Sequence, residues 1–173
     1  MQPNKSIIIM SQRLQSIFFF LSALLFALLF FLPLAEFDAE SNILLFNLFG
    51  IESGIPDGVV PFSKSFSLPV LVLGVTVMLL SGYLAMGLFR AVKLAQFVKL
   101  HKVARIDTIV IVAWIALVFA FYIPTIAKSL VGLNNIIYKV GVFLPLVALI
   151  LTIAAASGLR KDIKKVRSTD RIR

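Results

Sequence analysis

The sequence predicts an all-α membrane protein, a bundle of four antiparallel transmembrane helices with both ends in the cytoplasm. Three observations predict this class. Of the 173 residues, 60% are hydrophobic and only 14% are charged, too few polar groups to cover a water-soluble domain. Four apolar stretches are each long enough to cross a bilayer. Most of the basic residues lie in segments that share one side of the membrane.

Crossing about 30 Å of hydrocarbon takes roughly 20 apolar residues in a helix. The stretches that meet this length are about residues 14–34, 68–89, 108–127 and 140–157, and none contains Asp, Glu, Lys, Arg or His. We therefore expect residues 1–173 to form one four-helix membrane domain. In the alternative, the first 35 residues are a signal peptide cut after Ala35, but their apolar run is longer than usual and Pro33 stands where a small residue is wanted.

The distribution of basic residues predicts the orientation, because Lys and Arg near the ends of spans are retained in the cytoplasm. The N-terminal segment, the link between the second and third spans and the tail hold 14 of the 17 basic residues. The other side holds Lys64, Lys128 and Lys139 with five of the eight acids. Four spans with this asymmetry place both termini in the cytoplasm.

Residues 35–66 are expected to be an extracytoplasmic loop, interrupted by turns at its Gly and Pro residues. We favour a small β-hairpin in which Asn42–Ile51 pairs with Gly58–Phe62 across Gly54–Asp57; a short helix on the bilayer surface is the alternative.

Glu36 follows the first span directly, within reach of the three lysines on its side of the membrane. We take Glu36 and Lys128 as the candidate structural pair that ties the loop to the bundle, with Lys64 and Lys139 as the other possible partners.

The cytoplasmic side carries two basic segments. In the link Ala91–Ile106, polar and apolar residues alternate as in an amphipathic helix continuing from the second span. The tail, residues 158–173, has seven basic residues in its last fourteen. Each such charge near a membrane contributes about 1 kcal/mol of attraction to anionic lipid headgroups. A peptide that docks another protein is the alternative, and nucleic acid is not expected because no aromatic residue is interleaved for base stacking.

Small residues mark the faces where membrane helices approach each other. The predicted stripes are Ala23 and Ala27 in the first span, Gly74, Ser81, Gly82 and Ala85 in the second, Ala113, Ala116 and Ala120 in the third, and Gly141, Ala148, Thr152 and Ala156 in the fourth. We interpret them as contacts within the chain, and a docking face for a partner's helix is the alternative.

Catalysis or ion coupling inside a membrane needs ionisable groups at depth, and the four stretches contain none. The hydroxyls there, on Ser22, Thr76, Ser81 and Thr152, are expected to bond back to their own helix. Asp107 precedes the third span and is expected to act as an N-cap or first-turn acid. Without Cys, thiolate metal sites are excluded. We expect no enzyme, no cofactor and no metal.

The single histidine, His101, lies among basic residues of the link and is expected to be a solvated side chain at the membrane surface. A lipid-modifying enzyme that uses His101 or the carboxylates is a weaker alternative.

Segments at both ends of the chain resemble a known family. They are Ser11–Ile17 before the first span, Leu32–Phe37 after it, and Arg160–Asp162 and Val166–Arg173 in the tail. They are similar to an uncharacterised family of four-pass membrane proteins of Bacteroidetes bacteria, known only as a domain of unknown function, and the similarity covers essentially the whole chain. The resemblance implies an inner-membrane location and no activity. It also implies a shared cytoplasmic signature of Gln12, Arg13, Gln15, Arg167, Asp170 and Arg171. Our hypothesis is that Gln12 or Arg13 meets Asp170, so that the two ends form one polar cluster beneath the bundle.

These observations favour a non-catalytic accessory, scaffold or assembly subunit with a membrane-protein partner, and a homo-oligomer is also compatible. The alternative is a small oligomeric transporter or channel for an apolar or small solute. The candidate docking or headgroup contacts are Gln12, Arg13, Lys99, Lys102, Arg105, Arg160, Lys161, Lys164, Lys165, Arg167, Asp170 and Arg171.

Overall fold

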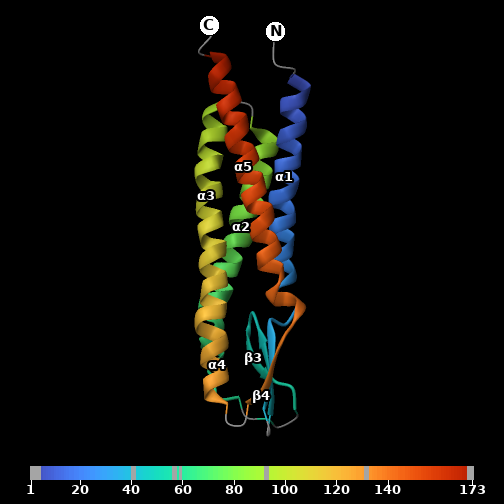
Figure 1. The fold of residues 1–173 in the computed structure, drawn as a ribbon, viewed down its shortest axis with the longest axis vertical. Helices are drawn as coiled ribbons and strands as arrows, with labels where there is room; N and C mark the ends of the chain where they lie inside the picture. The colour runs from blue at the N-terminus through green and yellow to red at the C-terminus, as the bar shows by residue number, and fades with distance from the viewer. Residues whose placement is uncertain are drawn as a thin grey trace.

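The structure, a computed structural model, describes residues 5–39, 42–55, 58, 60–91, 94–130 and 133–170. It is an elongated helical bundle with a small antiparallel β-sheet at one end, and both termini lie at the opposite end (Figure 1).

The helices of the bundle each pack on two neighbours that run in the opposite direction. They are α1 (Lys5–Leu28), α2 (Leu68–Arg90), α3 (Leu94–Ala116) and α5 (Leu144–Asp170), and α3 continues through the π-helix η2 (Leu117–Tyr122) into α4 (Ile123–Ser129). Around the bundle the order is α1, α2, α3, α5, with α5 packing back on α1 (Figure 1).

Within the described residues, three helices are long and apolar enough to cross a membrane: Ser65–Arg90, Ala95–Ser129 and Val140–Lys165. The apolar part of α1, Arg13–Leu28, is shorter. The first span was predicted to be helical as far as residue 34, but the observed helix ends earlier, at Leu28. Pro33 disfavours a helical conformation at the residue before it, and the Leu34 N–H donates to the Phe46 carbonyl in the sheet instead of a helix.

The basic link is also arranged differently from the expectation. The described part of the predicted link is α-helical from Leu94, and it continues into the third span instead of extending the second. The tail continues α5 without a break as far as Asp170. The π-helix η2 ends just before Pro124, which has no N–H to donate to the carbonyl of residue 120, and this lost bond accounts for the wider turn.

The loop of residues 35–66 forms strands, as favoured, but the expected partner strand is wrong. The sheet has the order β3-β2-β1-β4, with β1 (Ala35–Ala39), β2 (Asn42–Asn47), β3 (Gly50–Ser53) and β4 (Leu133–Tyr138), all antiparallel. Leu44 to Asn47 pair with Gly50 to Ser53 across a two-residue turn, so β2 has no free edge for Gly58–Phe62. The fourth strand comes from the connection between the third and fourth spans.

The sheet is attached to the bundle through its aromatic inner face. In β1 the residues Ala35, Phe37 and Ala39 are buried and alternate with partly exposed acids, the period of a half-buried strand. Phe46 of β2 stacks on Tyr122 with ring centroids 5.6 Å apart. Tyr122 belongs to η2 and donates a hydrogen bond to the Phe66 carbonyl just before α2. These contacts link the sheet to η2 and to the start of α2.

Three of the four predicted small-residue stripes lie at least partly inside the bundle. The prediction that the stripe on the third span contacts the other helices of the chain is wrong. Ala113, Ala116 and Ala120 are all exposed. The buried face of this helix comprises Ala104, Asp107, Ile111, Trp114 and Val118. The Trp114 indole sets this rotation, because it packs beside Gly74 and donates a 2.9 Å hydrogen bond to the Val70 carbonyl of α2.

Candidate functional site

A layer of four polar side chains crosses the centre of the bundle, one from each helix. Ser22 of α1, Ser81 of α2, Asp107 of α3 and Thr152 of α5 all have 0% of their surface exposed. Polar groups are expensive at this position, and in membrane proteins they are retained where they bind each other or serve a function. This layer is therefore the candidate functional site.

The four residues meet because they lie at one level of the bundle. On three helices the polar residue is eight or nine positions from the first arginine at the basic end, about 12–13 Å along the axis. These pairs are Ser22 with Arg13, Ser81 with Arg90 and Thr152 with Arg160. On α3, Asp107 is only two positions from Arg105, so the layer lies in the half of the bundle nearer the basic end.

Hydrogen bonds connect the layer in one sequence. Ser81 donates to Asp107 Oδ2 at 2.7 Å, Ser22 Oγ lies 3.4 Å from Ser81 Oγ, and Thr152 donates to Ser22 at 3.1 Å. Ser81 Oγ faces two acceptors, Asp107 Oδ2 and the more distant Ser22 Oγ, and because a hydroxyl carries one proton it donates to only one of them at a time. The four side chains therefore form one connected polar layer.

The expected N-cap role of Asp107 is wrong. The helix begins 13 residues earlier, at Leu94, so Asp107 lies about 20 Å inside it with its side chain turned to the bundle axis. The expectation that the interior holds no ionisable group is wrong for the same reason. Asp107 Oδ1 is buried without a hydrogen-bond partner among the described residues.

The expected hydrogen bonds of the hydroxyls are correct for one residue only. Thr76 donates to the Val72 carbonyl of its own helix at 2.8 Å. Ser22, Ser81 and Thr152 bond across helices instead. In lipid there is no hydrophobic drive between helices, so such cross-helix bonds help to determine how each helix is rotated.

A second polar contact joins the first and last helices nearer the basic end. Gln15 Nε2 donates to Asp162 Oδ2 at 2.7 Å, and Ser16 Oγ donates to the Ala85 carbonyl at 2.6 Å. Gly158 provides the space for Gln15, whose amide nitrogen would lie 2.9 Å from a Cβ there. The first and last helices of the chain thus contact each other through Gln15 and Asp162. This contact is distinct from the one expected between Gln12 or Arg13 and Asp170.

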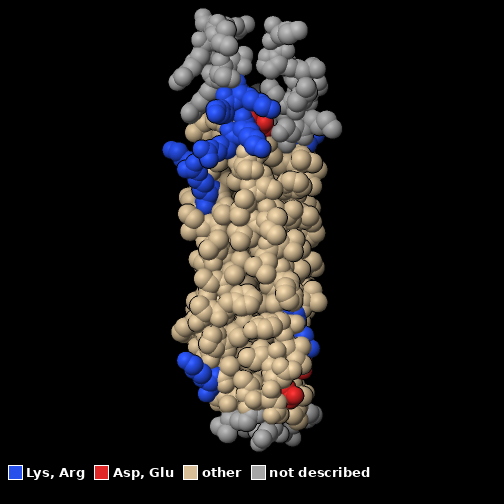
Figure 2. Space-filling model, in the orientation of Figure 1, with Lys and Arg blue, Asp and Glu red and all other residues tan. Residues whose placement is uncertain are grey.

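The predicted basic contacts gather at the end that carries the termini, beyond a band without surface charge (Figure 2). The side chains of Arg13, Lys99, Lys102, Arg105, Arg160, Lys161, Lys164 and Lys165 are exposed there. Gln12, Arg167, Asp170 and Arg171 lie outside the described side chains, so the expected contact between Gln12 or Arg13 and Asp170 does too.

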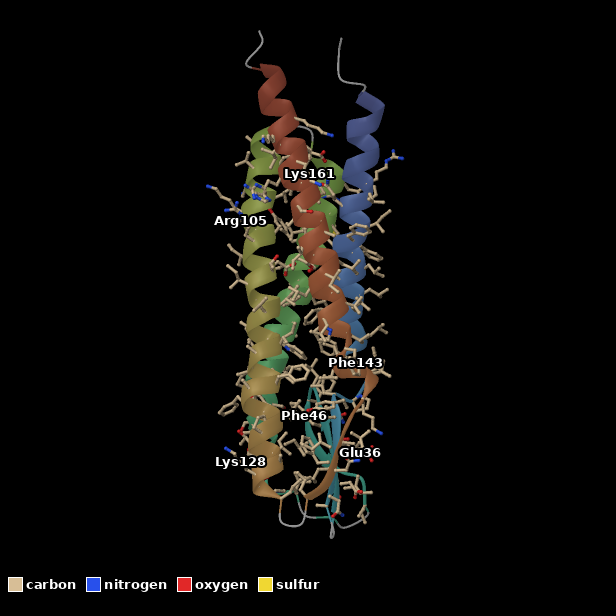
Figure 3. All side chains as sticks on the ribbon, viewed as in Figure 1. Glu36, Phe46, Arg105, Lys128, Phe143 and Lys161 are labelled. Atoms are coloured by element: carbon tan, nitrogen blue, oxygen red, sulfur yellow. The ribbon has the colours of Figure 1, made fainter. Side chains whose placement is uncertain are left out.

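The candidate pair of Glu36 and Lys128 is wrong. Glu36 instead forms an ion pair with Lys139, with Oε2 2.6 Å from Nζ. The reason is strand register: Glu36 is paired with Ile137 of β4, and Lys139 lies two residues further along the same face. Lys128 points outward from α4, away from Glu36 (Figure 3).

His101 is less exposed to solvent than expected. Both imidazole nitrogens are buried and have no hydrogen-bond partner among the described residues. The ring lines a groove between α3 and α5 together with Arg105 and Arg160. Within the described part of the chain, no group of three or more His, Cys, Asp or Glu residues could hold a metal ion.

A family model described as a domain of unknown function (DUF4293) matches residues 11–172. This match confirms the resemblance seen in the terminal segments at the level of a family without assigned activity. The comparison with curated proteins found no match.

Proposed function

The chain belongs to the DUF4293 family of unknown function, and we propose from its geometry that it is an accessory or assembly subunit of a larger membrane complex. In this role it is non-catalytic and binds a transmembrane helix of a partner protein. The proposed partner face is the exposed alanine stripe of α3, comprising Ala113, Ala116 and Ala120.

We place the protein in the bacterial inner membrane as four spans with both termini cytoplasmic. The distances between charges support this placement. Lys139 and Arg160 are 21 positions apart and Arg105 and Lys128 are 23 apart, about 31–35 Å of helix, which matches the hydrocarbon thickness. The excess of Lys and Arg at the end with the termini supports the orientation.

The first helix is included as a span although its apolar part is shorter. It packs against both α2 and α5 in the same band, and its outward side is apolar: Ile17, Phe20 and Leu24 are 53%, 61% and 45% exposed. A surface of this kind is stable beside lipid and would be costly in water. The turn and strand after Leu28 continue the crossing to the Glu36–Lys139 pair.

The alanine stripe of α3 is the observation that carries the docking proposal. Small residues let two helix backbones approach closely, and this close approach replaces the hydrophobic drive that lipid cannot supply. The bundle itself does not use this face, because the opposite side of α3 carries Asp107 and Trp114 inward. An exposed alanine stripe beside lipid therefore suits a second helix from another protein.

The polar layer supports a non-catalytic role. Its hydroxyls and one carboxyl oxygen bind each other, and Asp107 lines neither of the two surface grooves described at this end of the bundle. We interpret the layer as a clasp that sets helix rotation. Substrate chemistry would need a route from the surface to these groups.

The test is purification from native membranes in mild detergent, with quantitative mass spectrometry of the proteins that accompany the chain. We expect one stoichiometric partner with the wild-type chain and its loss from Ala116→Leu, because the leucine would separate the backbones. Ala154→Leu, at an exposed position of α5, is the matched control and should retain the partner. Equal recovery with both variants, or a wild-type chain recovered alone, would contradict the proposal.

Site-specific crosslinking checks the same face directly. Because the chain has no Cys, a single Ala116→Cys variant can carry a photoreactive label. A crosslink to the co-purified partner is expected. A crosslink only to a second copy of the chain would replace the accessory role by self-association.

A small transporter or proton channel is the second candidate, favoured by one observation: the buried Oδ1 of Asp107 has no partner. Proton flux into liposomes that contain the purified chain tests it. Flux that is lost in Asp107→Asn but kept in Thr76→Ala would establish this second function, and absence of flux from the wild-type chain would exclude proton transport.

A further inference from the structure

An open groove of about 420 Å³ runs between α3 and α5 on the lipid-facing surface. Its two walls have the same polarity pattern. Along α3 the lining residues are His101, Arg105, Thr108 and Ile109, and along α5 they are Arg160, Ser157, Ala156 and Ile153. The two helices are antiparallel, yet both walls change from cationic to apolar in the same direction, from the basic end of the bundle toward its middle.

We propose that this groove is a binding site for one anionic glycerophospholipid. The lipid phosphate lies between the guanidinium groups of Arg105 and Arg160, and one acyl chain lies along Ile109, Ile153 and Ala156. This inference rests on the membrane placement proposed above but is independent of the partner face.

Charge complementarity identifies the occupant. Arg105 and Arg160 come from different helices and face one groove, so each places a like charge near the other, an arrangement that an anion stabilises. A guanidinium group binds phosphate through two parallel hydrogen bonds. A headgroup with its own ammonium group would be repelled by the arginines, so the site favours a lipid with net negative charge.

His101 provides a second and independent observation. Both of its nitrogens are buried without a hydrogen-bond partner, an arrangement that costs free energy unless something binds them. The ring lines the cationic end of the groove. A rotation of the ring toward the groove would bring its N–H to a phosphate oxygen between the two arginines, which is the acceptor that it lacks.

The groove between α1 and α2 provides a comparison within the same molecule. It has a similar volume, about 400 Å³, and lies at the same end of the bundle. Arg90 is its single basic lining residue, and the facing wall of α1 offers no second cation. Size and apolar lining are therefore common to both grooves, whereas the paired arginines distinguish the groove between α3 and α5.

Quenching by brominated lipids tests the site in the intact chain. An Ile153→Cys variant carries a fluorophore in the groove, and a Tyr83→Cys variant carries the same fluorophore on α2. The two positions are matched, since each side chain is 50% exposed and lies seven positions from the arginine of its own helix. Each labelled protein is reconstituted into phosphatidylcholine vesicles with a minor fraction of dibrominated phosphatidylglycerol or, separately, of dibrominated phosphatidylcholine.

We expect phosphatidylglycerol to quench the Ile153 label more strongly than phosphatidylcholine does, and both lipids to quench the Tyr83 label equally. Arg105→Gln with Arg160→Gln should lower the relative association constant for phosphatidylglycerol by about tenfold or more, because each guanidinium group loses a charge-assisted hydrogen bond to the phosphate, about tenfold apiece. Lys161→Gln with Lys164→Gln removes the same charge from exposed positions outside the groove. It should change the constant by less than twofold.

Three results would overturn the proposal. Equal quenching of the Ile153 label by both lipids would exclude a preference for anionic lipid. A preference that survives loss of both arginines would exclude the phosphate contact. Displacement of the brominated lipid by inorganic phosphate would reduce the site to one for a free anion. No quenching of the Tyr83 label by either lipid would instead contradict the membrane placement itself.

Discussion

The hydrogen bond between Ser81 and Asp107 makes the role of the polar layer measurable. We consider Ser81→Ala, which removes the donor and leaves the buried carboxyl group without any hydrogen bond among the described residues. Leaving a buried polar group unsatisfied costs about 1–3 kcal/mol, and more when the group is charged. Cross-helix hydrogen bonds measured in bilayers are weaker, about 0.6 kcal/mol on average and about 1.7 kcal/mol at most.

From these limits we expect a loss of about 1–2 kcal/mol in the free energy of unfolding, because the 2.7 Å bond to a carboxyl oxygen belongs to the stronger class. The assay is unfolding by SDS in mixed micelles. Trp114 is the single tryptophan of the chain and is fully buried, so its fluorescence reports directly on the centre of the bundle.

A double-mutant cycle separates this bond from the other effects of the substitutions. Ser81→Ala and Asp107→Ala together should cost less than the sum of the two single variants by about 1–2 kcal/mol, since each single variant already breaks the bond. Thr76→Ala is the control on the same helix, because its hydroxyl bonds only to its own helix in the structure. Additive costs in the cycle, or an equal cost for Thr76→Ala, would refute the clasp.

Two further predictions concern the end of the molecule that carries the sheet. In the same unfolding assay, a double-mutant cycle between Glu36 and Lys139 should give a coupling energy of about 0.2–1 kcal/mol, as for other partly exposed ion pairs. A cycle between Glu36 and Lys128 should give no coupling. The reverse result would contradict the strand register. Gly141→Ala should lower the free energy of unfolding by about 1–3 kcal/mol, because its Cβ would overlap a backbone carbonyl in the turn before β1. Gly82→Ala, with no atom within 4 Å of the added Cβ, should leave stability unchanged or slightly raised, and an equal loss at both glycines would show that the overlap is not the cause.

Features that depend on local sequence were predictable. The second span was expected at 68–89 and is the helix Leu68–Arg90. Hydrophobic length and the absence of charge determine such a helix, and both are read directly from consecutive residues. The first span was expected to reach residue 34 because its apolar run continues that far, but apolar composition does not distinguish the helix that ends at Leu28 from the turn and strand that follow.

The polar layer was missed because charge was used to set the limits of the third span. Asp107 lies two residues after Arg105, so it appeared to mark the start of the third span. Comparing distances from the arginines would not have corrected this. Ser22, Ser81 and Thr152 are eight or nine positions from the arginines of their own helices, whereas Asp107 is only two positions from Arg105. The packing of the four helices against each other decides which residue of the third helix meets the three hydroxyls.

The fourth strand could not be found from local patterns. Its pairing joins residues 35–39 with 133–138, almost 100 positions apart, and the segment is shorter than many loops. The exposure of the alanine stripe on α3 could not be found from local patterns either, because alanine occurs on both packed and exposed faces of helices. The large side chain of Trp114 decides the rotation through its bond to the Val70 carbonyl, a contact between helices that spacing alone does not reveal.

Both proposed surfaces depend on the rotation of α3, and this dependence connects them to the polar layer. Asp107 and Trp114 hold one side of the helix inward, which turns the alanine stripe toward lipid and places His101 and Arg105 beside α5. If the layer is a clasp, Asp107→Ala should weaken both partner recovery and the preference for anionic lipid. The double arginine variant should weaken only the lipid preference, and Ala116→Leu only partner recovery. An Asp107→Ala chain that keeps both properties would show that packing alone orients α3 and that the carboxyl group serves another purpose.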